Sequence, residues 1–455
     1  MTSLSTTRPP GPRVPPGPPR SAAIALLPRM IRNRLEVMDQ IAADYGDAAR
    51  IPLGPKTLYL FNHPDHARHV LADNAANYHK GIGLIQARRV MGDGLLTSEG
   101  DLWRKQRKVI QPVFQPKRIA RQAESIVTEA EALIGRLRTH IGSGPVDMRE
   151  EMTALTLGVL GRTLLDADLG AFDSVGDAFE TVQNQAMFEM MSLGMVPLWL
   201  PLPRALRFRK AQRYLQRITD TLAAQRERHP GTDDVISRLI TSVRQEPDPR
   251  FGRRRMRDEL VTLLLAGHET TASTLSWALH LLDRHPEVRE QVHAEALEVL
   301  GHGPVTAESL HQLRYTTMVL EEVMRLYPPV WILPRIAQAA DQVAGYRIPA
   351  RADVLICPFL LHRHPSFWPD PQRFDPQRFS PEARVGRHRY AYIPFGAGPR
   401  FCVGNSLGML EATIVLAMLA RDLRLRTIPG YEVAGEPMLT LRVRGGLPMN
   451  VEPAR

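Results

Sequence analysis

Apolar residues recur with helical spacing along most of this chain, so helices make up most of the predicted elements. We expect helices over residues 35–45, 122–138, 148–164, 171–191, 256–282, 287–300, 308–327 and 405–423. Short runs bounded by glycine and proline predict strands over 49–53, 57–61, 345–348 and 353–358, and a hairpin of 439–443 and 447–451 around Gly445-Gly446. The helix 256–282 is apolar on nearly every side in its first half, which is typical of a buried helix. The pattern indicates a mainly α-helical protein with small β-sheets.

Length and composition are compatible with one large domain. The 455 residues are 44% hydrophobic, which is enough for a substantial core. Residues 1–20 are rich in proline and predict an extended, mobile tail, and we expect residues 21–455 to form a single domain. The apolar run 22–27 is too short to cross a bilayer, so we expect no membrane anchor. No acidic residue precedes Glu36, as in a transit peptide, but the prolines argue against its amphipathic helix; we expect a cytoplasmic protein.

Charge and cysteine usage narrow the class further. The net charge of +10 raises the question of nucleic-acid binding, but the chain lacks the interleaved aromatic and basic residues of such proteins. We therefore expect no nucleic-acid partner, and we expect a monomer. The two cysteines, Cys357 and Cys402, lie far apart without a pairing pattern, so nothing indicates an oxidising compartment. The arginine run 253–255 predicts a surface loop that leads into the helix 256–282.

Residues 395–404 read Phe-Gly-Ala-Gly-Pro-Arg-Phe-Cys-Val-Gly and place Cys402 in a glycine-rich turn before the helix 405–423. Gly396 and Gly398 allow turns that bring backbone N–H groups close to the sulfur. The helix N-terminus is expected to favour a thiolate at Cys402. A lone thiolate, with no second cysteine or nearby histidine to complete a zinc set, suits one axial bond to a haem iron. The alternative is a small buried cysteine that merely opens a helix.

A polar cluster, Ala-Gly-His-Glu-Thr-Thr, interrupts the predicted buried helix at residues 266–271. Small residues at 266 and 267 leave room for a flat cofactor and a diatomic ligand. The hydroxyl of Thr270 can bond the carbonyl of Ala266, four residues back, and so loosen the helix. Glu269 supplies a proton reservoir beside that hydroxyl, whereas His268 has no required role. The alternative is a helix kink whose polar groups are satisfied locally.

These two stretches resemble motifs of the cytochrome P-450 family. The family's haem-binding pattern, Phe-x-x-Gly-x-Arg-x-Cys-x-Gly, is matched at Phe395, Gly398, Arg400, Cys402 and Gly404, and residues 266–271 match its oxygen-activation motif. The resemblance covers about residues 30–455 and implies the cytochrome P-450 fold, with haem b buried between the long central helix and the helix after the cysteine loop. It implies a haem-thiolate monooxygenase that inserts one oxygen atom from O2 into an apolar small molecule.

The resemblance also assigns roles to single residues. Cys402 would be the axial iron ligand, whose electron donation assists O–O cleavage, and Glu269 and Thr270 would deliver protons. Trp103 and Arg107, spaced i, i+4 on one helical face, match the family's pair beside a haem propionate. The other cofactor-binding positions that it implies are Ala266, Arg335, Phe395, Arg400 and Gly404.

A second set of matches is structural. Glu322 and Arg325, with the later Arg378, match the family's buried triad of one glutamate and two arginines. Such a network is costly unless it is fully hydrogen-bonded, so we expect it to fix geometry beneath the haem and to take no part in catalysis. The tetrapeptide Pro-Gln-Arg-Phe occurs twice, and its spacing to the cysteine loop favours Arg378 over Arg373.

Apolar side chains occupy the positions that the resemblance assigns to the substrate pocket: Leu84, Ile85, Met187, Val330, Leu333 and Met438. They fit a terpenoid, polyketide, fatty acid or aromatic substrate equally, as in specialised metabolism. The methionine-rich segment 187–202 suits either a lid over an apolar channel or plain core.

Electrons are expected to come from a separate protein, because no flavin or nicotinamide domain remains once the haem fold is accounted for. We expect a ferredoxin or flavodoxin with its reductase. A basic patch of Arg104, Lys105, Lys108 and Arg389 would steer such an acidic partner, or is an unspecific solubilising surface. Two other classes stay open. One is a haem-thiolate peroxygenase or isomerase, which needs no proton relay, and the other is a non-catalytic haem sensor or electron carrier.

Overall fold

The computed structural model describes residues 13–53, 56–167, 169, 175–192, 195–228, 234–301 and 309–454. Their contacts divide the chain into two compact units. Unit 1 comprises Met1–Ile82, Ile332–Pro369 and His388–Phe401, and unit 2 comprises Gly83–Trp331, Asp370–Arg387 and Cys402–Arg455. The chain therefore passes from unit 1 to unit 2 within the cysteine loop. The single domain expected over residues 21–455 stays a prediction.

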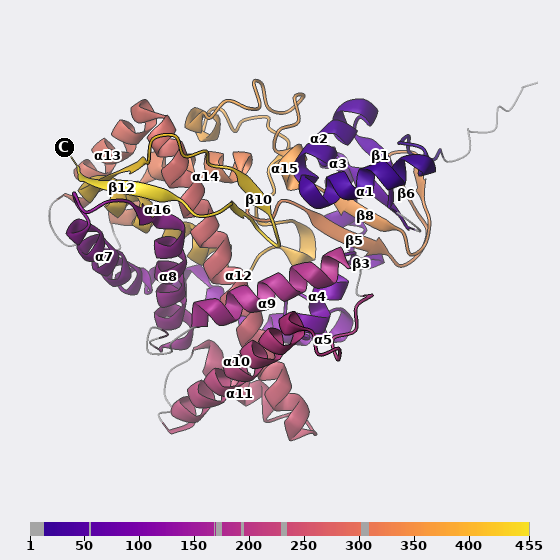
Figure 1. Cartoon of the computed structure of the whole chain (residues 1–455), viewed down its shortest axis with the longest axis horizontal. Helices are drawn as coiled ribbons and strands as arrows, with labels where there is room; N and C mark the ends of the chain where they lie inside the picture. Colours follow the sequence, from indigo (N-terminus) through magenta and orange to yellow (C-terminus); the bar gives the residue numbers. More distant parts are fainter. Residues whose placement is uncertain are drawn as a thin grey trace, which may run out of the picture. The chain divides into compact units, whose positions relative to one another are not determined.

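Unit 1 is built on a five-stranded sheet with the order β1-β2-β8-β5-β3 (Figure 1). Its strands are β1 (Ala48–Leu53), β2 (Lys56–Phe61), β3 (Tyr78–Lys80), β5 (Leu333–Ala337) and β8 (Asp353–Ile356), and β6 (Asp341–Val343) pairs with β7 (Tyr346–Ile348). In this sheet β2 and β8 run parallel and the other neighbours antiparallel. The helical elements of unit 1 are α1 (Ala23–Arg32), α2 (Arg34–Tyr45), α3 (Pro64–Arg68), α15 (Pro358–Leu361), η1 (Arg20–Ala22), η2 (His69–Asp73), η3 (Ala75–Asn77), η9 (Arg389–Ala391) and η10 (Gly398–Arg400).

The end of the proline-rich leader is fastened to unit 1. The N–H of Arg13 donates to the carbonyl of Gly345 at 3.1 Å, and the N–H of Arg50 donates to the carbonyl of Pro16 at 2.8 Å. The mobile tail predicted through residue 20 does not hold for residues 13–19, because main-chain hydrogen bonds tie them to strands. The rest of that predicted tail, residues 1–12, lies outside the described residues.

Unit 2 holds most of the helices. They are α4 (Leu84–Met91), α5 (Gly100–Ile110), α6 (Pro116–Ala120), α7 (Ala123–Thr139), α8 (Met148–Leu160), α9 (Val175–Met191), α10 (Pro203–Arg228), α11 (Val235–Val243), α12 (Pro249–Arg284), α13 (Pro286–Leu300), α14 (Arg314–Leu326) and α16 (Asn405–Asp422), with η4 (Gln111–Phe114), η5 (Gly161–Leu165), η7 (Ser309–Gln312) and η8 (Pro376–Phe379). The predicted helices are confirmed, although two begin elsewhere: α12 begins at Pro249 and not at 256, and α14 begins at Arg314, after the separate short helix η7. The predicted start of α9 at 171 falls outside the described residues.

Helix α12 is 36 residues long and begins before the arginine run that was predicted to be a loop. The Asp248 carboxylate accepts the N–H of Arg250 at 2.8 Å, and Pro249 occupies the first turn, so the helix is capped there. Within the helix Arg255 is buried and pairs with Glu246. The loop prediction was wrong because the run is part of a helix that packs on α11.

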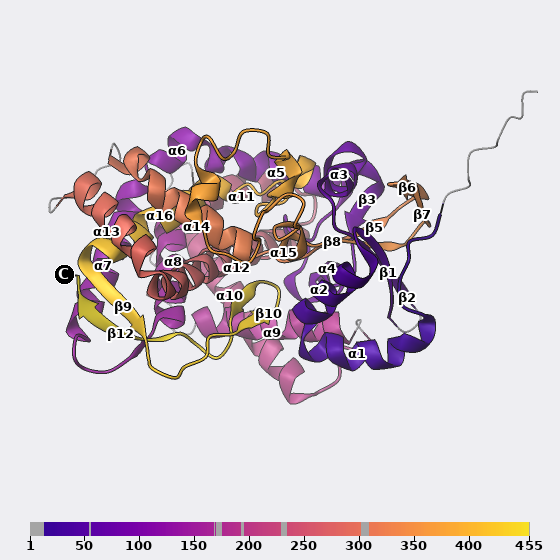
Figure 2. The same cartoon turned by 90° about the horizontal axis from the view of Figure 1, so that it is seen from above.

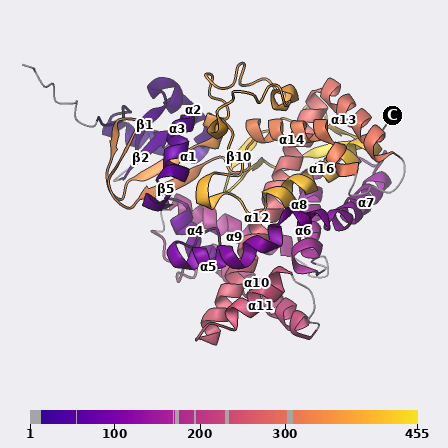
Figure 3. The same cartoon turned by 180° about the vertical axis from the view of Figure 1, so that it is seen from behind.

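Helix α12 packs against α8, α14 and α16, and Figure 3 shows these helices together. A Cβ on Gly267 would lie 2.7 Å from a methyl carbon of Leu160, so this glycine permits the close approach of α8. The ring of Trp277 on α12 stacks on Tyr327 with centroids 3.9 Å apart. The apolar side chains predicted to bury the first half of this helix, at positions 260, 261 and 263–265, are all buried.

The small sheets of unit 2 correct the predicted C-terminal hairpin. Strand β12 (Pro448–Pro453) pairs with β9 (Leu423–Thr427) and β4 (Val146–Asp147), whereas β11 (Leu441–Val443) pairs with β10 (Gly435–Pro437) (Figure 2). Gly445 and Gly446 have φ of 72° and 103° and do reverse the chain. The carboxylate of Asp147 accepts the N–H of Leu447 at 2.8 Å, which directs the second strand into a different sheet.

None of the helices in the described part of the chain combines the length and the apolar character that a bilayer crossing requires.

Candidate active site

Cys402 lies in unit 2, two residues before Gly404, which is the N-cap of α16. Its side chain is exposed, yet desolvation by the surrounding protein raises the pKa of its thiol. The N–H groups of Gly404 and Asn405 and the charge of Arg107 act in the opposite direction on this pKa. The predicted influence of the helix start is present in the two N–H groups, which act against the effect of desolvation on this pKa.

The backbone before Cys402 takes the turns that its glycines permit. Gly396 and Gly398 have φ of 72° and 66°, values that side chains rarely adopt. A Cβ on Gly398 would lie 1.9 Å from the carbonyl oxygen of Leu71, so no larger residue fits without moving the backbone. Phe395 meets the ring of Phe401 edge to face, with centroids 6.4 Å apart. The predicted need for glycine in this loop is confirmed.

The potential metal ligands around Cys402 suit a metal ion that is already coordinated by a cofactor and needs one ligand from the protein. In the part of the chain that the structure describes, no group of three or more His, Cys, Asp or Glu side chains could hold a metal ion by itself. Cys402 offers one sulfur, with N–H donors and a guanidinium to stabilise its negative charge. Haem iron, already held by four porphyrin nitrogens, needs this kind of single protein ligand.

Helix α5 carries the predicted propionate-binding pair. Trp103 and Arg107 are both partly buried, and the Nε of Arg107 donates to the side-chain oxygen of Gln111 at 3.1 Å. Burial lowers the pKa of Arg107, while the charge of Cys402 acts to raise it. An arginine that is half withdrawn from water and coupled to the sulfur is well placed to neutralise an anionic cofactor.

The loop before α5 is fixed by a buried acid on α12. The Glu259 carboxylate accepts the N–H of Leu95 at 2.9 Å and is fully buried, and this burial raises the pKa of Glu259 to about 8. A Cβ on Gly94 would lie 2.0 Å from the hydroxyl oxygen of Thr262, so the loop lies directly on the helix. The Glu259 contact thus sets where the chain enters α5.

We expect Glu259→Gln to change how stability depends on pH. A carboxyl whose pKa is higher in the folded state stabilises the fold below its unfolded pKa, and this contribution is lost as pH rises through the folded value. The amide keeps the hydrogen bond and does not ionise, so the variant should nearly match the wild type at pH 5 and exceed its unfolding free energy by about 1–3 kcal/mol at pH 8. Urea unfolding at both pH values measures the difference. A gap that is the same at pH 5 and pH 8 would contradict the assignment.

The polar cluster on α12 begins with an exposed residue. Ala266 is exposed although the residues before it, 260–265, are buried. Thr270 donates its hydroxyl to the carbonyl of Ala266 at 2.7 Å, as its i, i+4 spacing predicts. Gly267 corrects the prediction, because its missing Cβ serves the contact with α8 and does not widen the open side. His268 is buried, and its ring Nδ1 lies 2.6 Å from the carbonyl oxygen of Leu264, a hydrogen bond within the helix. This agrees with the expectation that His268 has no required role in the chemistry.

Glu269 is held by two residues that sequence reasoning missed. One of its carboxylate oxygens, Oε1, accepts from the side-chain amide of Gln183 on α9 and from the hydroxyl of Thr440 at 2.7 Å. These partners are 86 and 171 residues away from Glu269 along the chain, so no local sequence spacing predicts the two hydrogen bonds. The acid is therefore fixed in orientation by a helix and by the turn before β11.

The structural triad is assembled as predicted. Arg325 donates to both oxygens of Glu322, at 2.7 and 2.8 Å, and both side chains are fully buried. Arg378 lies 3.6 Å from the same carboxylate, whereas Arg373 contributes its backbone carbonyl, which accepts from Arg325 at 3.0 Å. The choice of the second tetrapeptide copy is confirmed.

Two of the predicted pocket residues meet on one cavity of unit 2. This cavity of about 780 Å³ is bounded by α9, residues 196–202 and the start of α10, and Met187 and Met438 both line it. Residues 196–202, part of the methionine-rich segment for which a lid or plain core was expected, form one wall of this cavity. Leu84, Ile85 and Val330, also in unit 2, are not among its lining residues: Leu84 and Val330 are partly buried and Ile85 is exposed.

The remaining predicted residues belong to unit 1. Arg335 is buried on β5, where it faces Lys80 of β3 and Val354 of β8 in the strand register. Leu333 begins the same strand and is partly buried. Arg400 ends η10, also partly buried, just before the chain enters unit 2. Their roles towards a cofactor or substrate stay predictions.

The fold and this site define a haem-thiolate class of protein, and comparison with known proteins agrees. The family model described as "Cytochrome P450" matches residues 15–443, so the chain belongs to the cytochrome P-450 family. It is 36% identical over 445 residues to "Cyclooctatin synthase" of Streptomyces melanosporofaciens, covering 97% of this chain and 95% of the relative. It is 35% identical to "Cyclooctat-9-en-7-ol 5-monooxygenase" of the same organism (93% and 91% covered) and 32% identical to "Pentalenene oxygenase" of Streptomyces avermitilis (91% and 91% covered).

Membership of the family establishes the general activity. The chain is a cytochrome P-450 monooxygenase with the fold of that family, and its cofactor is haem, iron protoporphyrin IX. It uses O2 and takes electrons from a redox partner. The resemblance drawn from the cysteine loop and from the 266–271 cluster is confirmed.

Proposed function

We propose that this monooxygenase oxidises a terpenoid, inserting one oxygen atom from O2 into its hydrocarbon skeleton. The observation that supports this most directly is the similarity, over nearly the whole chain, to relatives named as a cyclooctatin synthase, a cyclooctat-9-en-7-ol 5-monooxygenase and a pentalenene oxygenase. A cavity of about 780 Å³ with Met187, Phe188, Leu198 and Met438 in its wall suits an apolar polycyclic substrate. Leu84, Ile85, Val330 and Leu333 are proposed to complete the apolar surroundings of the substrate.

Cys402 is proposed to bind the haem iron as a thiolate, with the N–H groups of Gly404 and Asn405 stabilising its charge. Arg107, Arg335 and Arg400 would neutralise the haem propionates through charge-assisted hydrogen bonds, and Trp103 would pack beside Arg107. Phe395 and Gly404 would border the thiolate side, and Ala266 the opposite side. When bound, haem supplies O2 binding and one-electron chemistry, which amino-acid side chains lack.

Glu269 and Thr270 are proposed to move protons to the site of oxygen reduction. Because Oε1 of Glu269 is engaged by Gln183 and Thr440, Oε2 is the oxygen proposed to exchange a proton. The Thr270 hydroxyl donates to the carbonyl of Ala266, so its lone pairs can accept a hydrogen bond, and the hydroxyl would have to release Ala266 and rotate before it passes its own proton onward. The two hydrogen bonds to Oε1 fix the orientation of the Glu269 carboxylate, and Oε2 is left to exchange a proton.

Replacing Thr270 by Ala should uncouple electron consumption from product formation. Without the hydroxyl, reducing equivalents would still be consumed, but product formed per reducing equivalent should fall about tenfold or more. Thr270→Ser keeps the hydroxyl and is the matched control, with coupling near that of the wild type. Coupling is measured as product against NADPH consumed. Unimpaired coupling in Thr270→Ala would favour the peroxygenase or isomerase class instead.

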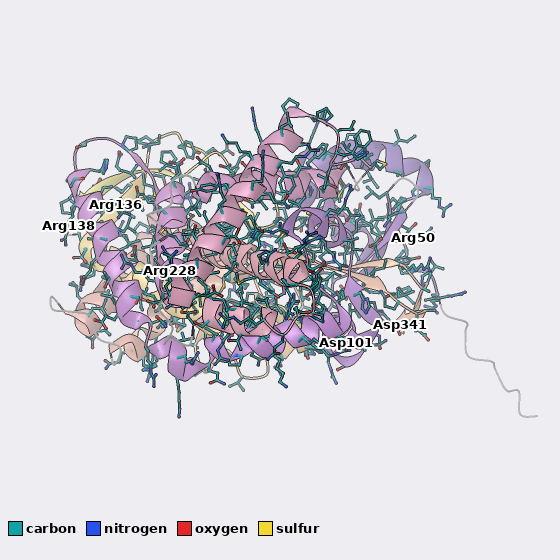
Figure 4. All side chains as sticks on the ribbon, turned by 90° about the horizontal axis from the view of Figure 1, so that it is seen from below. Arg50, Asp101, Arg136, Arg138, Arg228 and Asp341 are labelled. Atoms are coloured by element: carbon teal, nitrogen blue, oxygen red, sulfur yellow. The ribbon has the colours of Figure 1, made fainter. Side chains whose placement is uncertain are left out.

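A ferredoxin or flavodoxin with its reductase is the proposed electron source, working in the cytoplasm. Arg104, Lys105 and Lys108 are exposed on α5, where Arg104 also pairs with Asp101, which is labelled in Figure 4. Arg389 belongs to unit 1. Exposed basic groups would speed encounter with an acidic carrier, and salt would weaken this effect.

The proposed function is tested by reconstitution. Purified holoenzyme with ferredoxin, reductase and NADPH should oxidise members of a panel of bacterial sesquiterpenes and diterpenes, and the same compounds should perturb its haem spectrum on binding. The rate of reduction should fall as salt rises. Turnover of fatty acids or polyketides together with indifference to every terpenoid would overturn the substrate assignment.

A further inference from the structure

Imidazole rings hold the segment of unit 1 that leads into the cysteine loop. Nε2 of His362, a fully buried residue that follows α15, accepts the N–H of Ile393 at 2.8 Å. Nδ1 of His388, the N-cap of η9, accepts the N–H of Tyr390 at 3.1 Å. These two N–H groups lie two and five residues before Phe395, where the cysteine-loop motif begins. The two rings thus fix the path by which the chain enters this loop.

Both hydrogen bonds require a neutral ring. A backbone N–H can only donate, so the imidazole nitrogen opposite it must keep its lone pair. In His388 the proton is then on Nε2, which donates to the Asp65 carboxylate at 3.2 Å. When a second proton binds to such a ring, two N–H groups face each other and the bond to the main chain is lost. Histidine changes its charge between pH 5 and 8, so mild acid can break both contacts.

Two further histidines of unit 1 use a ring nitrogen in the same way. Nδ1 of His63 and Nδ1 of His364 each accept the N–H of the residue two positions ahead, at 3.2 Å. The rings of His63, His364 and His388 all lie near Phe367, with centroids 5.1 to 6.3 Å from that ring. Three segments that are distant in the sequence therefore meet at one cluster of imidazoles.

Two carboxylates face this cluster and favour charged rings. Asp47, in the turn before β1, lies 2.8 Å from Nε2 of His364. Asp65, on α3, takes the corresponding place at His388. Protonation would strengthen the bond from His388 to Asp65 and break the bond to Tyr390. A charged His388 is therefore drawn towards α3 and away from η9.

Other rings of the group are kept neutral by their surroundings. The ring of Tyr392 faces His362 at 5.1 Å, and the neighbouring Arg363 lies over Phe359. A proton on His362 would place a charge in a fully buried position. On α3, burial lowers the pKa of His66. A histidine with a lower pKa in the folded state withdraws stability as pH falls below its unfolded value, because the unfolded chain binds the proton more readily.

Helix α3 and η2, which follows it, touch both ends of the segment 388–401. One end is His388, through Asp65 on α3. The other end is Gly398, whose missing Cβ leaves room for the carbonyl oxygen of Leu71 on η2. A shift of η9 relative to α3 is therefore passed along the main chain to the residues that precede Cys402.

We propose that His362 and His388 are positioning residues for the haem ligand, which hold the cysteine loop in its binding shape only while their rings are neutral. In mild acid His388 follows Asp65, His362 releases Ile393, and the main chain from η9 onward shifts. The sulfur of Cys402 is then no longer held for iron binding. This inference rests on the proposed role of Cys402 as the iron ligand.

The test follows the carbonyl spectrum of the reduced holoenzyme from about pH 8 to about pH 5. The thiolate-type main band of the wild type should fall by more than about half and return on neutralisation. His362→Gln/His388→Asn keeps an acceptor oxygen near each ring nitrogen but does not titrate, so its midpoint should lie about one pH unit lower. His362→Leu/His388→Ala removes both acceptors and should show a weaker thiolate band even at pH 8. His140→Asn/His311→Asn, which replaces two exposed histidines of unit 2, is the matched control and should keep the wild-type midpoint.

A second readout follows the main chain without the haem spectrum. Hydrogen exchange of residues 388–394, compared at about pH 5.5, should be slower in His362→Gln/His388→Asn than in the wild type and unchanged in the control. A wild-type thiolate band that persists at pH 5, or a midpoint that the Gln/Asn pair does not move, would overturn the inference and leave the role of Cys402 intact. A thiolate band that the wild type lacks even at pH 8 would overturn the ligand assignment and this inference with it.

Discussion

Arg325→Ala should destabilise the protein by about 3–5 kcal/mol, because it leaves a buried carboxylate without its main counter-charge. The arginine is fully buried and donates to both oxygens of Glu322 and to the carbonyls of Pro371 and Arg373, at 2.7 to 3.0 Å. Alanine removes all four hydrogen bonds and leaves a cavity. Arg378, at 3.6 Å from the carboxylate, cannot replace the paired donors. Urea unfolding of the holoenzyme, and the yield of haem-containing protein, measure the loss.

A surface arginine gives the matched control for this prediction. Arg136 on α7 pairs with Glu151 at 3.2 Å and is half exposed (labelled in Figure 4). Arg136→Ala should cost no more than about 1 kcal/mol, because solvent screens the pair and side-chain entropy offsets it. If Arg325→Ala unfolded at the urea concentration of the wild type, the triad would not be the structural element described here.

Cys402→Ala should abolish monooxygenase activity, because it removes the sulfur that is proposed to bind the haem iron. The variant is expected to lose most of its haem, or to keep haem with the spectrum of a haem without thiolate, and turnover should fall below detection. Cys402 is not part of the structural triad of Arg325, so Cys402→Ala should still unfold cooperatively. Difference spectroscopy and haem content distinguish loss of the ligand from loss of the fold.

The other cysteine is the control for Cys402. Cys357 is fully buried, and burial raises the pKa of its thiol to about 12, so it behaves as a small apolar residue. Cys357→Ala should keep the haem spectrum and the coupling of the wild type. Retained turnover in Cys402→Ala, or lost haem ligation in Cys357→Ala, would overturn the assignment of the iron ligand.

Features that depend on local spacing could be read from the sequence. The hydrogen bond from Thr270 to Ala266 follows from a four-residue separation on a helix, and the pairing of Glu322 with Arg325 follows from three. The turns at Gly396 and Gly398 follow from the residue type. These predictions were confirmed because one helix or one turn contains every atom that they involve.

Features that depend on distant segments could not be read in this way. The hydrogen bonds from Gln183 and Thr440 to Glu269 connect α9 and the turn before β11 with α12. No sequence pattern in these three segments predicts them. Gly267 looked like space for a cofactor, but Leu160 of α8 lies against it. The N–H groups that favour a thiolate at Cys402 follow from the local sequence, whereas the burial that raises its pKa does not.

The measurement that tests this account most directly is the absorption spectrum of the purified, reduced wild-type protein under carbon monoxide. A sulfur donor at position 402 predicts the strongly red-shifted main band of thiolate-ligated ferrous haem. A colourless protein, or a carbonyl spectrum like that of a histidine-ligated globin, would contradict it.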